Sequence, residues 1–366
     1  MNRLNGLQLA LVGPLPPPAG GMANQTRQLA ELLGGEGVEV RVVQTNAPYR
    51  PAWTARLPVL RAAVRLLPYL LRLWAVAGRS QLVHVMANSG WSWHLFAAPA
   101  IRIASRRGVP AIVNYRGGEA ASFMARSHRS VRRTMERAAA VVVPSEYLRQ
   151  VFAAYGIHTE VVPNVVDLNC FRPSVPSRTR GAHLVVTRNL EPIYDNATAI
   201  RALALVRARL PSARLTIAGS GPERRALEAL AAALGVAAAV TFTGRLEREA
   251  VAALYRDADV ALNPSTVDNM PNSLLEALAI GVPIVSTDVG GVPHIVQDGT
   301  TALLVPPRDP EAMARAALQL LENPDLSARL AAAGLQQARR YTWREVAPLI
   351  ADLYARVTAT KARDTL

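Results

Sequence analysis

The sequence predicts an α/β protein made of two doubly wound domains, each with a parallel sheet covered by helices on both faces. Short apolar runs rich in β-branched residues alternate with helical patterns along most of the 366 residues, as the buried strands of parallel sheets do. The alternation stops at a polar stretch, PSVPSRTRG (residues 173–181), and then starts again. A chain of this length has room for two such domains.

The expected strands fall into two series, one on each side of the polar stretch. The first series is Leu7–Val12, Val38–Val43, Leu82–Met86, Ala111–Asn114 and Val141–Val143. The second series is Leu184–Thr187, Leu215–Ala218, Val240–Thr243, Val260–Asn263, Ile284–Ser286 and Ala302–Val305. Apolar side chains at a helical period follow the first strand, at Met22, Thr26, Leu29 and Leu33. Ligands of open α/β sheets bind at the carboxyl ends of strands, so the expected site is the cleft between the two domains.

The expected domain bounds follow from the same pattern. Residues 1–172 form the N-terminal domain, and residues 173–181 form a hinge linker rich in proline and serine. Residues 182–340 form the C-terminal domain. Residues 341–366 form a last helix that we expect to pack back towards the N-terminal domain.

Charge is distributed unevenly along the chain. The formal net charge is +14, and Lys361 is the only lysine among the 41 basic residues. Residues 1–172 carry +12 of that net charge and residues 173–366 carry +2, which suggests an anionic partner for the N-terminal half. The single cysteine, Cys170, excludes an internal disulfide framework and fits a reducing compartment.

Three segments bear on membranes. The N-terminal apolar run is short and is interpreted as a first strand rather than a signal peptide. The uncharged stretch from Ser80 to Ile101 contains polar residues and Pro99, so it is interpreted as a buried strand plus a turn, not a membrane span. The segment Arg56–Arg79 mixes five arginines with leucine, valine and aromatic residues, as segments lying on an anionic bilayer do. The alternative is one or two amphipathic helices packed on the sheet and broken at Pro68.

Two loops have the composition of anion-binding sites. Gly20 and Gly21 lie between a strand and a helix, where backbone N–H groups can approach an anion; the alternative is an ordinary turn. Further on, Asp268 precedes a helix start and Glu276 falls in its first turns. The N–H groups of Asn272, Ser273 and Leu274 would face a diphosphate. One carboxylate could hold sugar hydroxyls and the other ribose hydroxyls, or the helix is simply capped, with Glu276 near its favourable end.

These motifs together resemble one family. The segments PPPAGG, VVPNVVDLNCFRP, AGSGPERRALEALAAALG, VTFTG and LNPSTVDNMPNSLLEALAIGVPIVSTDVGGVP, in this order, are similar to the retaining, two-domain glycosyltransferases of family 4. The resemblance extends to about Tyr341. It implies the GT-B fold, in which two Rossmann-like domains face a cleft. The N-terminal domain would then be on the acceptor side, and the C-terminal domain would hold the nucleotide sugar. The resemblance also implies transfer of a sugar from a nucleotide diphosphate sugar with retention at the anomeric carbon, without a bound metal or other cofactor.

The resemblance also implies roles for individual residues. Glu276 matches the glutamate that binds ribose, and Asp268 stands where the family contacts the donor sugar. Arg188 matches the arginine on the diphosphate, next to the backbone N–H groups of Ser273 and Leu274. The nucleotide would also be bound by Gly20 and Gly21 over the phosphates, by Gly219 in AGSGPE, by Asn272, and by Thr243 and Gly244 near the base.

The chain departs from the family pattern at three places. Asp268 replaces a glutamate, and no lysine stands five residues after Arg188, where the chain has Ile193. The N-domain histidine near the donor sugar is also replaced, in the stretch NYRGGE. We hypothesise that Arg116 in this stretch reaches the cleft and partly restores the lost charge. The alternative is a surface arginine.

The leading hypothesis is therefore a cytoplasmic hexosyltransferase that builds a surface or exported glycan, such as a lipopolysaccharide or exopolysaccharide. Its partners would be a nucleotide sugar, a glycan or lipid-linked acceptor, and the inner face of the cytoplasmic membrane. The alternatives are a catalytically weak nucleotide-binding scaffold subunit and a nucleotide-sugar epimerase on a similar fold. Without a GxGxxG fingerprint after the first strand, a dinucleotide dehydrogenase is disfavoured. No sequence motif supports nucleic acid as a partner.

Overall fold

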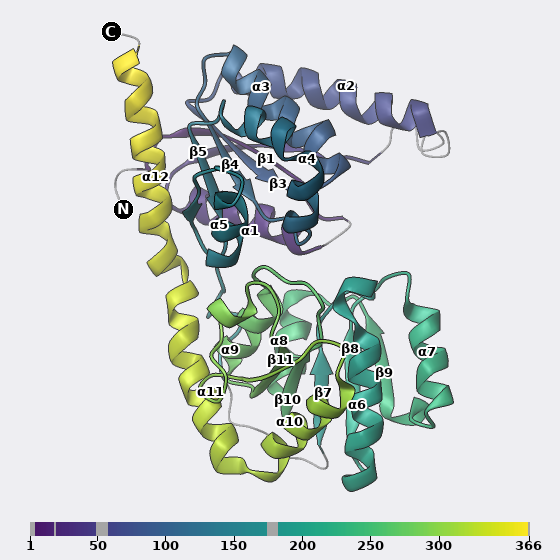
Figure 1. Ribbon diagram of the computed structural model, residues 1–366. Coiled ribbons are helices and arrows are strands. Elements are labelled where there is room, and N and C mark those ends of the chain that lie inside the picture. Colours follow the sequence, from purple (N-terminus) through teal and green to yellow (C-terminus); the bar gives the residue numbers. More distant parts are fainter. Residues whose placement is uncertain (1–3, 18–19, 49–57, 174–181, 365–366) are drawn as a thin grey trace. The chain divides into compact units, whose positions relative to one another are not determined.

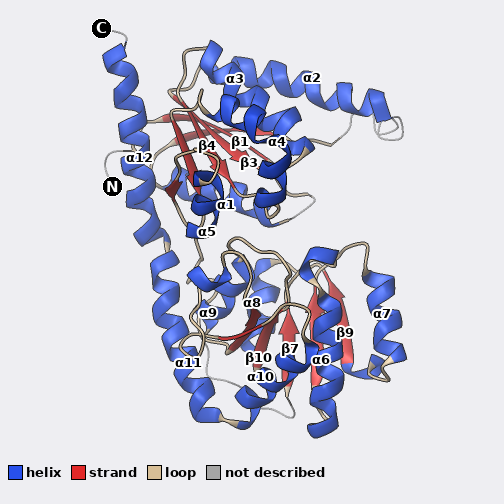
Figure 2. Cartoon of the chain, viewed as in Figure 1, coloured by secondary structure: helices blue, strands red, loops and turns tan. Residues whose placement is uncertain are grey.

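The chain folds into two compact units, each built on its own parallel sheet. The computed structural model describes residues 4–17, 20–48, 58–173 and 182–364. The first unit comprises Met1–Asn164 and Val346–Leu366, and the second comprises Val165–Glu345. Helices cover the sheet in each unit (Figures 1 and 2). The predicted α/β class and the two parallel sheets are confirmed.

The sheet of the first unit has six parallel strands in the order β2-β1-β3-β4-β5-β6. Its strands are β1 (Gln8–Gly13), β2 (Glu39–Gln44), β3 (Leu82–Ala87), β4 (Ala111–Tyr115), β5 (Ala140–Val143) and β6 (Glu160–Val161). Its helices are α1 (Gly21–Gly35), α2 (Pro58–Ala77), a π-helical turn (Trp93–Ala97), α3 (Ala98–Arg106), α4 (Ala120–Met135), α5 (Glu146–Ala153) and most of α12 (Trp343–Asp364). The five predicted strands are present. The two-residue β6, which pairs with β5, is not among the predicted strands.

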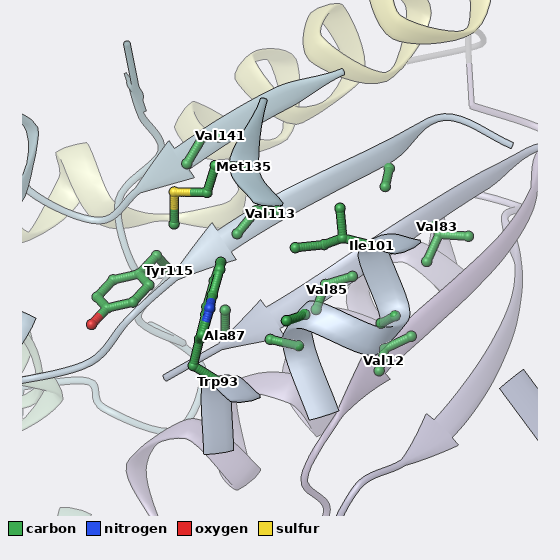
Figure 3. Packing of buried hydrophobic residues seen from close by; sticks show 14 of the residues in the cluster. Val12, Val83, Val85, Ala87, Trp93, Ile101, Val113, Tyr115, Met135 and Val141 are labelled. Carbon is green, nitrogen blue, oxygen red and sulfur yellow. The ribbon is translucent and has the colours of Figure 1, made fainter. Parts of the chain in front are cut away.

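The core of the first unit lies between the sheet and its helices. Every residue of β3 and β4 is buried, which explains why both strands consist mainly of apolar residues. Val85 and Val113 from these strands face Ile101 of α3, while Trp93 lies beside Tyr115 (Figure 3). The Tyr115 ring also meets that of Phe152 edge to face, with 4.8 Å between centroids.

Helix α2 runs without a break through Pro68, so the predicted break at this proline is wrong. A proline inside a helix removes one backbone hydrogen bond and strains the preceding turn. Here Pro68 is exposed, while Tyr69 and Leu73 on the same helix are buried in the core. The Tyr69 hydroxyl also donates to the carbonyl O of Phe96 at 2.8 Å. Packing of this face outweighs the local cost of the proline.

The sheet of the second unit is also parallel, in the order β12-β11-β10-β7-β8-β9. Its strands are β7 (His183–Val186), β8 (Arg214–Ala218), β9 (Val240–Gly244), β10 (Val260–Asn263), β11 (Ile284–Thr287) and β12 (Leu303–Val305). Its main helices are α6 (Asn196–Arg209), α7 (Arg224–Ala233), α8 (Arg248–Arg256), α9 (Asn272–Ile280), α10 (Pro310–Glu322) and α11 (Pro324–Ala338). All six strands predicted for this half are present.

The division between the units falls at Asn164, eight residues before the boundary expected at residue 172. The reason is apolar packing, because Val166 and Phe171 are buried in the core of the second unit. The backbone N–H of Val166 also donates to the carbonyl O of Tyr341 at 2.8 Å. Residues 174–181 of the expected hinge lie outside the described residues.

The last helix, α12, adds its residues from Val346 onwards to the first unit. Arg356 donates to both carboxylate oxygens of Glu160, at 2.6 and 2.7 Å. Tyr354 is buried there as well, at 1% exposure. Among the helices of the described ranges, none is both long and apolar enough to span a membrane.

Candidate functional site

Arg188 lies two residues after the end of β7 and is the centre of a polar cluster in the second unit. Its Nη2 donates to Asp268 Oδ2, and its Nη1 donates to Ser273 Oγ at 3.2 Å. The guanidinium carbon lies 4.0 Å from the ring centroid of Tyr194, within cation–π range. The Arg188 Nε–H is buried and has no acceptor among the described residues. The cluster therefore holds a cation in place and leaves one of its donors unused.

Two glycines let neighbouring loops approach the Arg188 and Asp268 backbones. A Cβ on Gly219, in the loop after β8, would lie 2.1 Å from the carbonyl O of Arg188. A Cβ on Gly291 would lie 1.8 Å from the carbonyl O of Asn269, and the N–H of Gly291 donates to the carbonyl O of Asp268 at 2.9 Å. Both positions therefore require glycine, which fixes the loops that carry the ion pair.

Asp268 is 9% exposed and is oriented by several donors. Besides Arg188, the backbone N–H of Asn269 donates to its Oδ1 at 3.0 Å. Burial raises the pKa of Asp268, and the Arg188 charge and a hydrogen bond with Ser265 act against that rise. The paired arginine is thus what offsets the cost of burying this carboxyl group.

Helix α9 begins at Asn272, and its first turn lies against Arg188. Ser273 contacts Arg188, as described above, and the Ser273 carbonyl accepts from the Tyr255 hydroxyl at 2.9 Å. The N–H of Leu274 donates to the carbonyl O of Pro271 at 3.2 Å. This N–H, one of the three expected to face a diphosphate, therefore already has an acceptor within the first turn of the helix.

Glu276 is half-buried one turn into α9. Burial raises the pKa of Glu276 to about 7, and the charges of Arg248 and Arg188 partly oppose this rise. No hydrogen bond or ion pair involves its carboxyl group within the part of the chain that the structure describes. Both of its oxygens are consequently available to hydroxyl donors.

Thr243 and Gly244 form the carboxyl end of β9. Thr243 is exposed, and its hydroxyl donates to the carbonyl O of Gly244 at 2.9 Å. Gly244 has φ +71°, a conformation that glycine adopts without strain. The polar atoms at this position are mostly those of the backbone.

Three of the site residues predicted from the sequence belong to the first unit. Gly20 is the N-cap of α1 and Gly21 is its first residue, and a Cβ at either position would meet nothing within 4 Å. Neither glycine is therefore required by local packing. Arg116 follows β4 and is only partly buried. It donates to three side-chain amides, those of Gln25, Asn114 and Asn164.

Sequence reasoning missed Tyr194 and Arg248. Tyr194 stands one residue beyond the position where a lysine was sought, and it carries Arg188 on its ring. Arg248 begins α8 and pairs with Asp167 at 3.2 Å. In the sequence, Tyr194 could have been found only from its closeness to Arg188, and Arg248 only from its closeness to the segment VTFTG. In the described ranges, no three His, Cys, Asp or Glu side chains are grouped as a metal site would need.

Comparisons with known proteins agree with these motifs. Residues 19–169 match the family described as Glycosyltransferase Family 4, and residues 171–337 match that described as Glycosyl transferases group 1. Over 288 residues the chain is 32% identical to a GDP-mannose-dependent alpha-(1-6)-phosphatidylinositol monomannoside mannosyltransferase of Mycolicibacterium smegmatis, covering 71% of this chain and 75% of that relative. It is also 39% identical over 137 residues to a D-inositol 3-phosphate glycosyltransferase of Corynebacterium urealyticum, covering 37% of this chain and 32% of that relative.

Solved structures share the fold over almost the whole chain. Sucrose-phosphate synthase from Thermosynechococcus elongatus matches with a TM-score of 0.73 and 20% identity, covering 97% of this chain and all of that one. The Anabaena protein HepE in complex with UDP matches with a TM-score of 0.73 and 17% identity, covering 95% of this chain and all of that one. At these identities the likeness is one of fold.

Proposed function

The chain belongs to the glycosyltransferases of group 1 and family 4, with the GT-B fold, and from this premise we propose that it is a retaining, metal-independent hexosyltransferase. The donor is a nucleotide diphosphate sugar. The acceptor is a surface or exported glycan, or a lipid-linked precursor of one. The relative that matches 71% of this chain is named as a GDP-mannose-dependent mannosyltransferase. This match favours GDP-mannose as the first donor to test.

The observation that carries this proposal is the arrangement of charges around Arg188. Its guanidinium lies beside the first turn of α9 and has an unused buried donor. A helix N-terminus and an arginine fork are both suited to a diphosphate. Glu276, one turn further on, has two oxygens available for the vicinal hydroxyls of a ribose.

In the proposed reaction, the bond between the anomeric carbon and the diphosphate oxygen breaks, and the acceptor oxygen bonds to that carbon on the same face. The proton of the acceptor hydroxyl passes to the leaving diphosphate oxygen. Negative charge develops on the leaving diphosphate. Arg188 and the α9 N-terminus stabilise that charge from the second unit, as preorganised donors do. Asp268 contacts the donor sugar, and Thr243 and Gly244 contact the base. We propose that Gly20, Gly21 and Arg116 also donate hydrogen bonds to the diphosphate.

The proposal is tested by thermal unfolding in the presence of GDP-mannose, UDP-glucose, ADP-glucose and dTDP-glucose. A ligand that binds only the folded protein raises its melting temperature, by an amount that grows with concentration. We expect one of these nucleotide sugars to do so, and the same compound to release its nucleoside diphosphate when acceptor is added. Absence of any shift at millimolar concentrations would contradict the proposal. Binding without transfer would favour the scaffold alternative.

We further propose that the first unit rests on an anionic membrane through α2. Leu67, Leu71 and Trp74 are 61%, 64% and 45% exposed and follow one another at helical spacing. We call these three residues the α2 stripe. Arg107 of the segment after α3 lies over the Trp74 ring at 4.8 Å. Arg72 of α2 and Arg79, two residues beyond the end of α2, are exposed. Apolar rings and leucines flanked by arginines suit the interface of the cytoplasmic leaflet.

Replacing Leu71 with aspartate is expected to weaken binding to phosphatidylglycerol vesicles by about tenfold or more, because a buried leucine contributes roughly 1.5–3 kcal/mol. The matched control is Leu205→Asp, which changes a leucine of the second unit that is 43% exposed. Vesicle co-sedimentation at low and high salt measures both. Equal binding of the two variants, or no binding of the native protein at low salt, would contradict this role of the α2 stripe.

A further inference from the structure

A line of hydrogen-bonded side chains crosses the core of the first unit and ends at Arg116. It begins at Tyr354 of α12, whose hydroxyl lies 2.7 Å from Nδ1 of His84 in β3. His84 Nε2 lies 3.0 Å from the amide nitrogen of Asn114 in β4. The amide oxygen of Asn114 accepts from Arg116 Nε, also at 3.0 Å. Tyr354, His84 and Asn114 are each 1% exposed.

Arg116 fixes the direction of every bond in this line. A guanidinium only donates, so the Asn114 side chain must present its oxygen to Arg116 and its NH₂ to His84. His84 Nε2 therefore accepts, and the ring proton sits on Nδ1, from which it is donated to the Tyr354 oxygen. Burial, with the charge of Arg116, lowers the pKa of His84 to about 3, so the ring stays neutral. The direction of each hydrogen bond in the line is therefore fixed.

The charge of Arg116 is not neutralised within its own unit. Its Nη1 donates to the amide oxygens of Gln25, at 3.0 Å, and of Asn164. No carboxylate lies within ion-pair distance among the described residues of the chain. Burial lowers the pKa of Arg116 only to about 10, so it remains cationic at neutral pH. A partly buried cation held only by neutral amides costs stability unless it serves an anion.

We propose that Tyr354 and His84 are positioning residues that orient Arg116 towards an anionic group of the substrate. Helix α12 thereby orients the guanidinium of Arg116, at the end of β4, through the buried side chains of His84 and Asn114. This inference rests on the proposed function, in which Arg116 contacts the diphosphate. It adds a role for α12 beyond apolar packing.

The test compares Tyr354→Phe with Tyr69→Phe. Each change removes one hydroxyl from a buried tyrosine of the same unit, and each hydroxyl has one hydrogen-bond partner. Tyr69 contacts Phe96 and lies outside the line. Release of GDP from GDP-mannose, and of UDP from UDP-glucose, gives kcat and KM. We expect Tyr354→Phe to lower kcat/KM by about tenfold and Tyr69→Phe by less than about twofold.

A double-mutant cycle with Arg116→Lys separates positioning from general stability. If Tyr354 acts through Arg116, Tyr354→Phe has little further effect once Arg116 is lysine. The inference would be overturned if the losses of kcat/KM from Tyr354→Phe and Arg116→Lys were additive. Equal losses of kcat/KM in Tyr354→Phe and Tyr69→Phe would also overturn it. If Arg116→Lys itself changes nothing while the nucleotide sugar still binds and reacts, the proposed contact of Arg116 with the diphosphate fails instead.

A second readout does not depend on turnover or on the stability of one variant. The Nε–H signal of Arg116 in nitrogen-15 NMR is assigned by its loss in Arg116→Lys. We expect this signal to shift in Tyr354→Phe and in His84→Leu, to be largely restored in His84→Gln, and to stay in place in Tyr69→Phe. Glutamine can accept from Asn114 and donate to Tyr354, whereas leucine can do neither. An unchanged signal in both line-breaking variants would contradict the positioning role.

Discussion

Replacing Arg188 with alanine is expected to lower kcat/KM for sugar transfer by about 10²- to 10³-fold, the range found when one preorganised charge-stabilising donor is removed. Arg188 pairs with Asp268 and contacts Ser273 at the start of α9. Its loss removes the cation closest to the proposed diphosphate. No lysine stands five residues later to compensate. No second cation at that position therefore buffers the loss.

The same substitution should destabilise the second unit. Asp268 would keep its burial and lose its arginine, and breaking a buried pair from one side costs about 3–5 kcal/mol. Activity must therefore be measured below the melting temperature of the variant. Arg214→Ala is the control, because Arg214 also pairs with an aspartate of this unit, Asp257, at 2.8 Å, but both side chains are about half exposed. A variant of Arg188 as active as that of Arg214 would contradict the assignment.

Replacing Glu276 with glutamine is expected to raise the donor KM by about 10- to 100-fold, since hydrogen bonds to a charged group contribute roughly 1.5–3 kcal/mol each. The carboxyl group has a pKa of about 7 in the donor-free protein, so it is half ionised near neutral pH. Ribose hydroxyls are bound best by the ionised form. The donor KM of the native enzyme should fall as pH rises from about 6 to 8, and that of Glu276→Gln should stay flat.

The pH dependence of the protein's stability gives an independent check. Stability should fall as pH rises, whereas donor binding should become tighter. The folded-state pKa of Glu276 is raised above its ordinary value of 4.5. The stability that this shift contributes is therefore full below pH 4.5 and is lost as pH rises through about 7. Glu276→Gln should flatten that part of the melting-temperature profile. Glu249→Gln, in the first turn of α8, is the control, and identical profiles for both variants would rule out the role of Glu276.

Most of the fold could be predicted because parallel strands buried on both faces consist of apolar runs, such as Leu82–Ala87 and Val260–Asn263. The two residues of β6 are too few to show a pattern. The continuity of α2 through Pro68 depends on the burial of Tyr69, a tertiary contact. The sequence contains the proline but not the packing that tolerates it.

The site could be predicted only as far as its residues lie in compact motifs. Asp268, Ser273 and Glu276 fall within nine residues of one another. Spacing in the sequence does not indicate that Arg188 is bound to Asp268, 80 residues away. It also does not indicate that the Arg188 guanidinium lies over the Tyr194 ring. Two of the three partners of Arg116 are also remote in sequence, because Gln25 of α1 is 91 residues away and Asn164 is 48 residues away. Contacts of this kind depend on how strands are ordered in the sheet, which local patterns leave open.

The placement of α12 has a consequence for how the protein is made. The first unit needs Tyr354, which is synthesised 270 residues after its partner His84. A ribosome adding roughly 5–20 residues per second takes on the order of 10–40 s to translate Val165–Glu345, which separates the two parts of that unit. During this time His84 and Asn114 have no tyrosine to complete their line. The N-terminal unit therefore matures last, although its chain emerges first.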